Sequence, residues 1–429
     1  MEGLLIFAIF FIFVFLSVPI GISLGLAVVI YSAITGNINF NYIATGMFTS
    51  CDSFPLMAIP FFVLSGALME GGGLSKRLVG FFDTLVGHFT GGLAVVTVVS
   101  CLFFGAISGS APATVAAIGT IMVPSMIEMG YEKRWSMALV AASGCLGTII
   151  PPSIPMVMYG VSTGASISTM FMAGFLPGIL CGLTLIVIAV RYCKKNGYHG
   201  NGLKFSGRRV WESFKEAVWA LLVPVIILGG IYGGFFTPTE AAVIAVFYGL
   251  IVGLFIYREL DLKRIYMKLA ESANTSGTIL IIVGTGTILG RVLTIEQVPQ
   301  MVAKAMLGLT DNWIIMMILM NLLLLVVGCL METTSAILIL SPILYPVVAA
   351  CGVDMIHFGI IMVINLSIGF ITPPVGVNLF VACGIGGIKF VELCKKIIPF
   401  LIALLIGLLI ITYIPDIVLF IPRLGGYAG

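Results

Sequence analysis

The chain has 429 residues, of which 60% are hydrophobic and 9% are charged. A soluble globular protein carries about 25% charged residues, so this composition excludes a soluble enzyme or binding module and indicates a protein that lies mostly in a membrane. The formal net charge of +3 is small, so the placement of the charges along the chain is more informative than their sum.

Stretches of about 20 apolar residues are long enough to cross a bilayer as helices. Nine spans are predicted, at residues 4–35, 54–71, 134–163, 168–191, 216–234, 237–257, 266–291, 356–386 and 391–420. Shorter amphipathic segments at 73–89 and 294–309 are expected to lie along an interface, and residues 197–215 form a polar linker. The start of the chain lacks a basic region and a cleavage site, which favours a retained span over a signal peptide.

Two apolar windows, residues 93–130 and 313–352, are interrupted near the middle by small, hydroxylated or acidic residues. The interruptions are SGSAPAT at 108–114 and METTSA at 331–336. One interpretation is two ordinary spans joined by an exposed turn, and the other is a re-entrant helical hairpin with a buried tip. Each arm has about 15 residues, or about 22 Å of helix, which is short of a bilayer core. Re-entrant hairpins are therefore favoured.

Each of these windows is followed by an apolar segment that is broken at a proline pair. The first break is at Pro151–Pro152 and the second at Pro373–Pro374, 222 positions later, and the same shift carries Gly147 onto Gly369. A broken helix is tolerated in a membrane only where it is buried in protein or lines a polar cavity. Two breaks in corresponding positions of two halves are typical of the binding site of a secondary transporter.

The basic residues orient the predicted spans. With the N-terminus in the cytoplasm, 18 of the 21 Lys and Arg residues lie on the cytoplasmic side, and only Arg291, Lys304 and Arg423 lie outside. Such a bias is expected of membrane proteins. The two hairpins then open on opposite sides of the membrane, which makes the two halves inverted repeats.

The sequence therefore predicts an all-α polytopic membrane protein with two inverted-topology repeats. The first repeat is 1–191, with its hairpin at 93–130 and its broken helix at 134–163; a cytoplasmic loop and an extra span follow at 192–236; the second repeat is 237–429, with its hairpin at 313–352 and its broken helix at 356–386. Repeats of this kind can exchange conformations around a site at the bilayer midplane.

The hairpin tips and the broken helices converge on the repeat axis in this arrangement. Free N–H groups at half-helix N-termini suit an anion, whereas carbonyl and hydroxyl oxygens suit a hard cation such as Na⁺. The residues predicted to hold Na⁺ are Ser108, Gly109, Ser110, Gly147, Ile150, Pro151, Gly328, Thr333, Gly369, Thr372 and Pro373. The residues predicted to contact the substrate are Ser108, Ser153, Arg291, Glu332, Thr334 and Asn378.

Each of these predictions has a simpler alternative. The glycines and serines would also permit close helix packing, and Glu332 would also cap the start of a half-helix. Arg291 is a candidate anion ligand because a guanidinium binds a carboxylate through two hydrogen bonds. The alternative for Arg291 is a side chain that reaches out to the membrane interface.

The sequence contains little that points to catalysis or to a bound cofactor. The nine Cys are scattered without a CxxC pair, and the three His are far apart, so neither a disulfide framework nor a zinc site is predicted. The segment GTGTILG at 284–290 is not a dinucleotide fingerprint, because no strand precedes it and its spacing differs. We therefore expect no enzyme and no organic cofactor, with Na⁺ as the coupling ion.

Four segments together resemble the large membrane subunit of tripartite ATP-independent periplasmic (TRAP) transporters, of the DctM or SiaM type. They are FPLMAIPFFVLSGALMEGGGLSKRL at 54–78, SGSAPATVAAIG at 108–119, GFFTPTEAAVIAVFYGL at 234–250 and the ITPPVGVNLF break at 371–380. The resemblance covers essentially the whole chain. It implies that Ser108–Pro112, Gly147–Ser153, Met331–Ser335 and Gly369–Asn378 are hairpin tips and Na⁺-binding breaks.

The resemblance also implies Na⁺-coupled import of a small carboxylate across the bacterial inner membrane by an elevator movement. Sialic acid and C4-dicarboxylates are both compatible with it, and sialic acid is slightly favoured. Two partners are implied, a small four-helix membrane subunit, expected here as a separate chain, and a periplasmic substrate-binding protein. The alternatives are a self-sufficient Na⁺/anion symporter that needs no binding protein and, in another class, an intramembrane enzyme or a scaffold.

Overall fold

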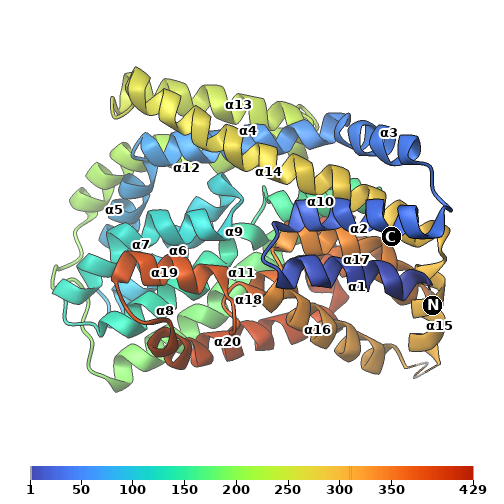
Figure 1. Cartoon of the computed structure of the whole chain (residues 1–429). Coiled ribbons are helices and arrows are strands. Elements are labelled where there is room, and N and C mark those ends of the chain that lie inside the picture. Colours follow the sequence, from blue (N-terminus) through green and yellow to red (C-terminus); the bar gives the residue numbers. More distant parts are fainter. Residues whose placement is uncertain (1, 309, 311, 429) are drawn as a thin grey trace.

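The computed structural model describes residues 2–308, 310 and 312–428, and the regular structure within them is entirely helical (Figure 1). Ten helices in this part of the chain are long and apolar enough to cross a membrane. The predicted all-α polytopic membrane fold is therefore confirmed.

The predicted span at 4–35 is wrong. The structure has two short helices instead, α1 (Glu2–Phe15) and α2 (Ile20–Thr35), which pack side by side and are joined by a tight turn (Figure 1). At 14 and 16 residues they are about 21 and 24 Å long, each shorter than a bilayer core. The turn has a left-handed residue at Ser17 (φ 61°) and Pro19 as the N-cap of α2. The residues on both sides of this turn are apolar, so the hydropathy pattern does not reveal it.

An outer layer of helices lies along one side of the molecule, at the top of Figure 1. It contains α3 (Phe40–Cys51), which was not predicted, α4 (Ala58–Gly71), α12 (Gly207–Tyr232), α13 (Pro238–Ile251) and α14 (Leu262–Ile295). The helix α14 has 34 residues, which is about 51 Å, and it packs against α2, α3, α4 and α17. It begins at Asp261, whose carboxylate accepts a hydrogen bond from the Arg264 backbone N–H (2.7 Å).

Four short helical segments lie next to these longer helices in the chain. A 3₁₀ turn at Phe54–Met57 precedes α4, and a π-helical turn at Val252–Ile256 extends α13. The amphipathic segments at 73–89 and 294–309 fold as α5 (Leu74–Val86) and α15 (Val298–Leu307). Residue 309, the last of the second segment, lies outside the described residues.

Both interrupted windows fold as pairs of helices joined by two residues. The first pair is α6 (Gly92–Ser108) and α7 (Ala111–Glu128), and the second is α16 (Trp313–Leu330) and α17 (Thr333–Ala350). Gly109 in the first tip has φ +61°, a backbone conformation that favours glycine. Pro112 lies in the first turn of α7, where its missing N–H costs nothing.

The two broken helices occupy the centre of the molecule. The first consists of α8 (Lys133–Gly144), α9 (Leu146–Ile149) and α10 (Ile154–Thr163), and the second of α18 (Met355–Gly369) and α19 (Val377–Gly386). Both contain a cis peptide bond at the proline pair, and the predicted breaks are confirmed. Every residue from 135 to 160 and from 356 to 371 is buried, as expected of helices that are apolar on all sides.

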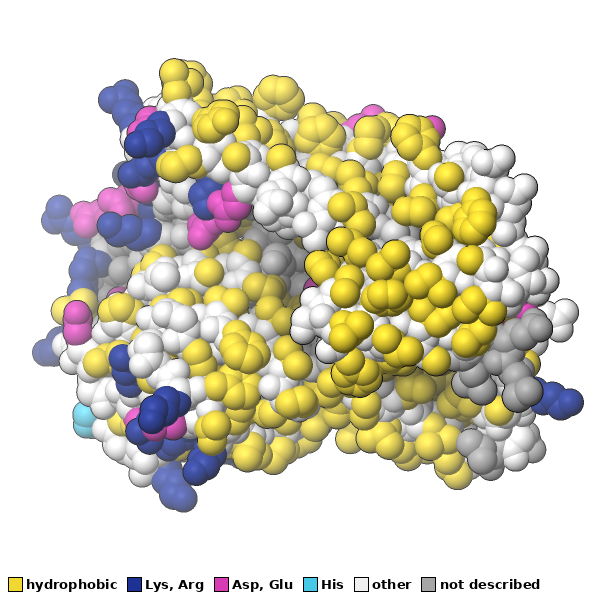
Figure 2. All heavy atoms as spheres, in the orientation of Figure 1, with side chains coloured by type: hydrophobic (Ala, Val, Ile, Leu, Met, Phe, Trp, Pro, Cys, Tyr) yellow, Lys and Arg dark blue, Asp and Glu magenta, His cyan; other side chains and the backbone are white. Residues whose placement is uncertain are grey.

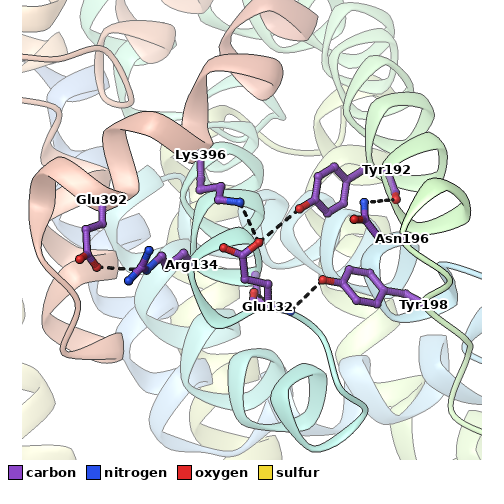
Figure 3. A network of polar contacts seen from close by, with 8 residues as sticks. Glu132, Arg134, Tyr192, Asn196, Tyr198, Glu392 and Lys396 are labelled. Atoms are coloured by element: carbon purple, nitrogen blue, oxygen red, sulfur yellow. Dashed lines mark hydrogen bonds and ion pairs between the residues drawn. The ribbon is translucent and has the colours of Figure 1, made fainter.

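The remaining helices, α11 (Ile167–Lys195), α20 (Phe390–Tyr413) and α21 (Pro415–Leu424), pack beside the broken helices. The predicted span 391–420 is thus two helices, separated at Ile414, which is not helical. A polar network joins α20 and the end of α11 to the segment that leads into α8 (Figure 3). In it the Glu132 carboxylate accepts hydrogen bonds from Lys396 Nζ (2.7 Å) and from the Tyr192 hydroxyl (3.3 Å). The network therefore holds these three segments together at one end of the molecule.

Candidate functional site

The tip of the first hairpin lies inside the protein, against the first break. A Cβ atom on Gly109 would be 3.0 Å from the Pro152 carbonyl oxygen, and one on Gly105 would be 2.7 Å from Gly147 Cα. On its other side Gly147 faces the Ser110 carbonyl, 2.6 Å from the place of a Cβ. No side chain fits at this contact, so glycine is required at position 147 because the two backbones touch.

Several oxygen atoms gather where this tip meets the break. Ser108 Oγ and Thr114 Oγ1 are 3.1 Å apart, and Thr114 donates a hydrogen bond to the Ser110 carbonyl (2.7 Å). Ser108 and Thr114 are both buried. The structure thus brings together Ser108, Gly109, Ser110 and Gly147, the first group of predicted Na⁺ ligands. Ile150 and Pro151 follow in the same break and are buried there.

The second hairpin meets the second break in a similar way. A Cβ atom on Gly369 would be 2.6 Å from Gly328 Cα, so these two predicted residues are also in backbone contact. Thr372 Oγ1 donates to the Ile368 carbonyl (2.9 Å), and Pro373 is exposed. Thr333 is fully buried, and within the described part of the chain its hydroxyl has no hydrogen-bond partner. A ligand that supplies a positive charge would satisfy that oxygen.

Glu332 caps the start of α17, which is the simpler of its two interpretations. Its carboxylate accepts hydrogen bonds from the Thr334 and Ser335 backbone N–H groups (3.0 and 3.2 Å) and from Thr334 Oγ1 (2.7 Å). A carboxylate at this position is stabilised by the helix dipole. Capping does not remove Glu332 from the site, because the same residue also lines a cavity.

This cavity, of about 350 Å³, lies between both hairpin tips, both breaks and α14. The tips and the first break contribute the polar residues Ser110, Thr148, Glu332 and Thr334 to its lining, and α14 contributes Asn274, Thr275 and Thr278. Among the described residues that line it, Glu332 carries the only formal charge. A second cavity of about 160 Å³ shares Ser110 and Thr275 with it. The site therefore offers hydroxyls and an amide to a small polar ligand.

Of the other predicted substrate contacts, Ser108 lines only the smaller cavity, and the remaining three line neither cavity. Ser153 is buried behind the lining of the larger cavity, where its hydroxyl donates to the Thr148 carbonyl (2.5 Å). Asn378 is buried between α19 and α8, and its amide donates to the Ala141 carbonyl (3.1 Å). Arg291 is exposed and lies beside Gly46 of α3. It follows Thr275 by 16 residues on α14, which is about 24 Å of helix.

Five residues of the site were not predicted from the sequence. Thr114 lies inside the predicted motif at 108–114 and Thr148 inside the predicted break at 147–153, but neither was named as a ligand. Asn274, Thr275 and Thr278 lie on one face of the predicted span 266–291, and polar groups inside a predicted span are a signal of function. These polar residues are visible in the sequence, but the sequence does not show that they face the hairpin tips across the cavity.

Half-helices and hairpin tips around a polar cavity, within a helical bundle that is apolar outside, define a secondary transporter as the class of protein. The sequence comparisons lead further. Residues 7–417 match the family model described as the tripartite ATP-independent periplasmic transporter, DctM component. The chain belongs to this family.

Three of its curated relatives are named as permeases of such transporters, which confirms the expectation of a transporter rather than an enzyme. The chain is 50% identical to the isethionate TRAP transporter permease protein DctMQ of Oleidesulfovibrio alaskensis, over 97% of this chain and 65% of that protein. It is 38% identical to the C4-dicarboxylate large permease protein DctM of Rhodobacter capsulatus, over 99% and 100% of the two chains. It is 39% identical to the sialic acid large permease protein SiaM of Vibrio cholerae, over 96% of each.

The fold also resembles a solved structure, that of the YdaH transporter of Alcanivorax borkumensis. The TM-score is 0.62, the sequence identity is 14%, and the match covers 87% of each chain. At this identity the likeness concerns the fold alone.

Proposed function

We propose that this chain is the membrane carrier of a Na⁺-coupled import system for a small organic anion. The observation that carries the proposal is the single cavity walled by both hairpin tips, both breaks and α14. Half-helix termini supply N–H groups for the anion, and the Ser110 hydroxyl and the Asn274 amide supply further donors. The Na⁺ sites are the two places where hairpin and break touch, at Gly147 and at Gly369.

The substrate is proposed to be a small sulfonate or carboxylate. The relatives named above act in the transport of isethionate, C4-dicarboxylates and sialic acid, and all of these carry an ionised acid group. The higher identity to the isethionate permease favours a small sulfonate over the sialic acid that the sequence analysis slightly favoured. A sulfonate stays ionised at any physiological pH, so neutral donors together with a bound cation are sufficient to hold it.

The proposed orientation still places most Lys and Arg residues in the cytoplasm, but it places the N-terminus on the outer side of the membrane. Lys and Arg side chains gather at the left end of the molecule, around α5, whereas both chain termini lie toward the other end (Figures 1 and 2). The first basic residue of the chain is Lys76, so the charges do not depend on how residues 1–35 cross. The positive-inside rule puts the left end in the cytoplasm and the N-terminus outside, opposite to the orientation predicted from a single span.

An elevator movement would allow Arg291 to bind the substrate, although Arg291 lies far from the cavity in this conformation. The two hairpins and the two broken helices form one body, and α14 is a long straight element beside it. A slide of that body along α14, by about 24 Å at most, would bring the cavity from Thr275 toward Arg291. The guanidinium would then bind the acid group of the substrate in the outward-facing state.

Two partners are part of the proposal, a small membrane subunit and a periplasmic binding protein that delivers the substrate. The chain spans about two thirds of the isethionate relative, so that protein has room for a further membrane segment in the same polypeptide. A self-sufficient Na⁺/anion symporter is not favoured, because the relatives are permeases of TRAP transporters.

Counterflow of labelled isethionate, succinate and sialic acid into proteoliposomes tests the proposal. Uptake is expected for one of these anions, and only when Na⁺, the small subunit and the binding protein are all present. Uptake without Na⁺ would contradict the cation coupling. Uptake without the binding protein would favour the self-sufficient symporter.

A further inference from the structure

Two buried hydroxyl groups meet between the two broken helices. Thr148 Oγ1 in α9 and Ser367 Oγ in α18 are 2.7 Å apart, although the residues are 219 positions apart in the chain. Thr148 is 3% exposed and Ser367 is fully buried. Thr148 directly follows Gly147 at the first break, and Ser367 precedes Gly369 at the second break by two residues. The pair therefore stands between the two proposed Na⁺ sites.

Each of these hydroxyls has a second acceptor within reach. Thr148 Oγ1 is 2.9 Å from the Cys145 carbonyl, and Ser367 Oγ is 2.6 Å from the Val363 carbonyl. A hydroxyl has only one proton to donate. If both protons pointed at the carbonyls, two hydroxyl oxygens would face each other at 2.7 Å with no proton between them. One hydroxyl must therefore donate to the other.

Two discrete arrangements satisfy this requirement. In the first, Thr148 donates to Ser367 and Ser367 donates to the Val363 carbonyl. In the second, Ser367 donates to Thr148 and Thr148 donates to the Cys145 carbonyl. The two arrangements differ in the direction of both O–H dipoles, and in a buried environment such dipoles interact strongly because no water screens them.

We propose that this pair couples the two Na⁺ sites, an inference that rests on the proposed function. A cation held at the first break repels the positive end of the Thr148 O–H bond and turns it toward Ser367, which selects the first arrangement. In this arrangement the Ser367 proton points at the Val363 carbonyl, one turn back along α18 and away from Gly369, so a cation near Gly369 favours the same arrangement. The pair is then already oriented when the second cation binds, and that step carries no cost of reorientation. The result is positive cooperativity, which is reciprocal between the two sites.

Thr148 and Ser367 are positioning residues in this account, because they act on the cation sites through the orientation of a proton. Thr148 also lines the substrate cavity, and its carbonyl accepts the Ser153 hydroxyl. Occupation of the cavity and of the first break therefore acts on the same residue.

The test is equilibrium binding of radioactive Na⁺ to the purified full chain, without any substrate. The wild type is expected to show a Hill coefficient above one. Thr148→Val and Ser367→Ala each remove one hydroxyl and should lower the Hill coefficient to about one, while the half-saturating Na⁺ concentration changes by less than about threefold. The double variant should behave like either single variant.

The conservative variants Thr148→Ser and Ser367→Thr keep the hydroxyls and should keep the wild-type Hill coefficient. If only side-chain volume mattered, these variants would change it. The chain also provides a matched control. Ser162 Oγ and Ser341 Oγ are 2.8 Å apart and join α10 to α17, away from both breaks. Ser341→Ala should therefore leave the Hill coefficient unchanged.

The outcomes separate this inference from the proposed function. A wild type that binds Na⁺ with a Hill coefficient of one overturns the coupling and leaves the Na⁺ sites standing. Variants without the hydroxyls that remain cooperative do the same. A wild type that binds no Na⁺ overturns both proposals.

Discussion

The two breaks share a proline pair and a glycine contact, yet their surroundings differ. Pro151, Pro152 and Ser153 are buried, whereas Pro373, Pro374 and Val375 are exposed. In the first break the Thr148 carbonyl accepts the Ser153 hydroxyl. The residues that correspond by the shift of 222 are Phe370 and Val375, and the Phe370 carbonyl accepts the Asn378 backbone N–H instead (3.0 Å).

The difference separates what the local sequence determines from what the fold determines. The proline pair ends the helix because proline has no N–H to donate to a carbonyl of the preceding turn. The glycine permits the close contact with the hairpin backbone. Whether the residues of the break are buried depends on the element that packs against them. In the first break it also depends on the hydrogen bond from the Ser153 hydroxyl to the Thr148 carbonyl. We therefore expect the first break to be the more rigid and the less accessible of the two.

The largest expected effect comes from the glycine contacts that the two breaks share. Gly147→Ala places a methyl group against the Ser110 carbonyl, and such overpacking costs about 1–3 kcal/mol while displacing a proposed Na⁺ ligand. Transport should fall to background. Gly229→Ala in α12 is the control, because no atom lies within 4 Å of the added methyl group. Transport by Gly147→Ala at more than half the wild-type rate would contradict the backbone contact as a functional element.

A substitution of Arg291 is expected to show the next largest effect. Because Arg291 lies away from both breaks in this conformation, its effect is independent of the difference between them. Arg291→Lys keeps the charge and loses the planar fork. The apparent substrate constant should rise about tenfold, which corresponds to about 1.4 kcal/mol of binding free energy, with little change in Na⁺ affinity. Titration of uptake against substrate measures it. If both Arg291→Lys and Arg291→Ala match the wild type, the side chain only reaches to the interface.

The second break is tested by Thr372→Val, which keeps the shape and removes one oxygen. The loss of one hydroxyl ligand should weaken the apparent Na⁺ affinity about three- to tenfold, or about 0.7–1.4 kcal/mol. Folding should change less, because the hydroxyl donates to an Ile368 carbonyl on its own helix. Na⁺ titration of uptake and thermal unfolding of the purified chain give the two numbers. An unchanged Na⁺ titration would remove Thr372 from the site.

The hydrogen bond from Ser153 to the Thr148 carbonyl is tested by Ser153→Ala, for which we expect the smallest effect on transport. The variant leaves the Thr148 carbonyl with one hydrogen bond fewer in a buried place, which costs about 1–3 kcal/mol of stability. Thermal unfolding should show the loss, and transport should be only slightly slower. Ser125→Ala is the control, because Ser125 donates only to a carbonyl one turn back in its own helix, α7. Equal unfolding temperatures for both variants and the wild type would show that this hydrogen bond does not stabilise the break.

Much of this site could be predicted because its signals are local. Gly-rich breaks, hydroxylated tips and their common shift of 222 are visible without any knowledge of the fold. The turn at Leu16–Pro19 could not be predicted, since the residues on either side are equally apolar. The polar face of α14 and the Thr148–Ser367 contact depend on which helices meet, and no local pattern determines that. The charge of Arg291 marked it as unusual but gave no information on its depth relative to the cavity.

The central claim is that both tips and both breaks move together past a fixed α14. The most direct measurement is transport after mercury cross-linking of Ser110→Cys to Thr275→Cys, in a chain without other reactive thiols. Both positions line the two central cavities, one on the first tip and one on α14. The account predicts that the cross-linked protein still binds Na⁺ but does not transport, and that a reducing thiol restores uptake. Full transport by the cross-linked protein would contradict the movement.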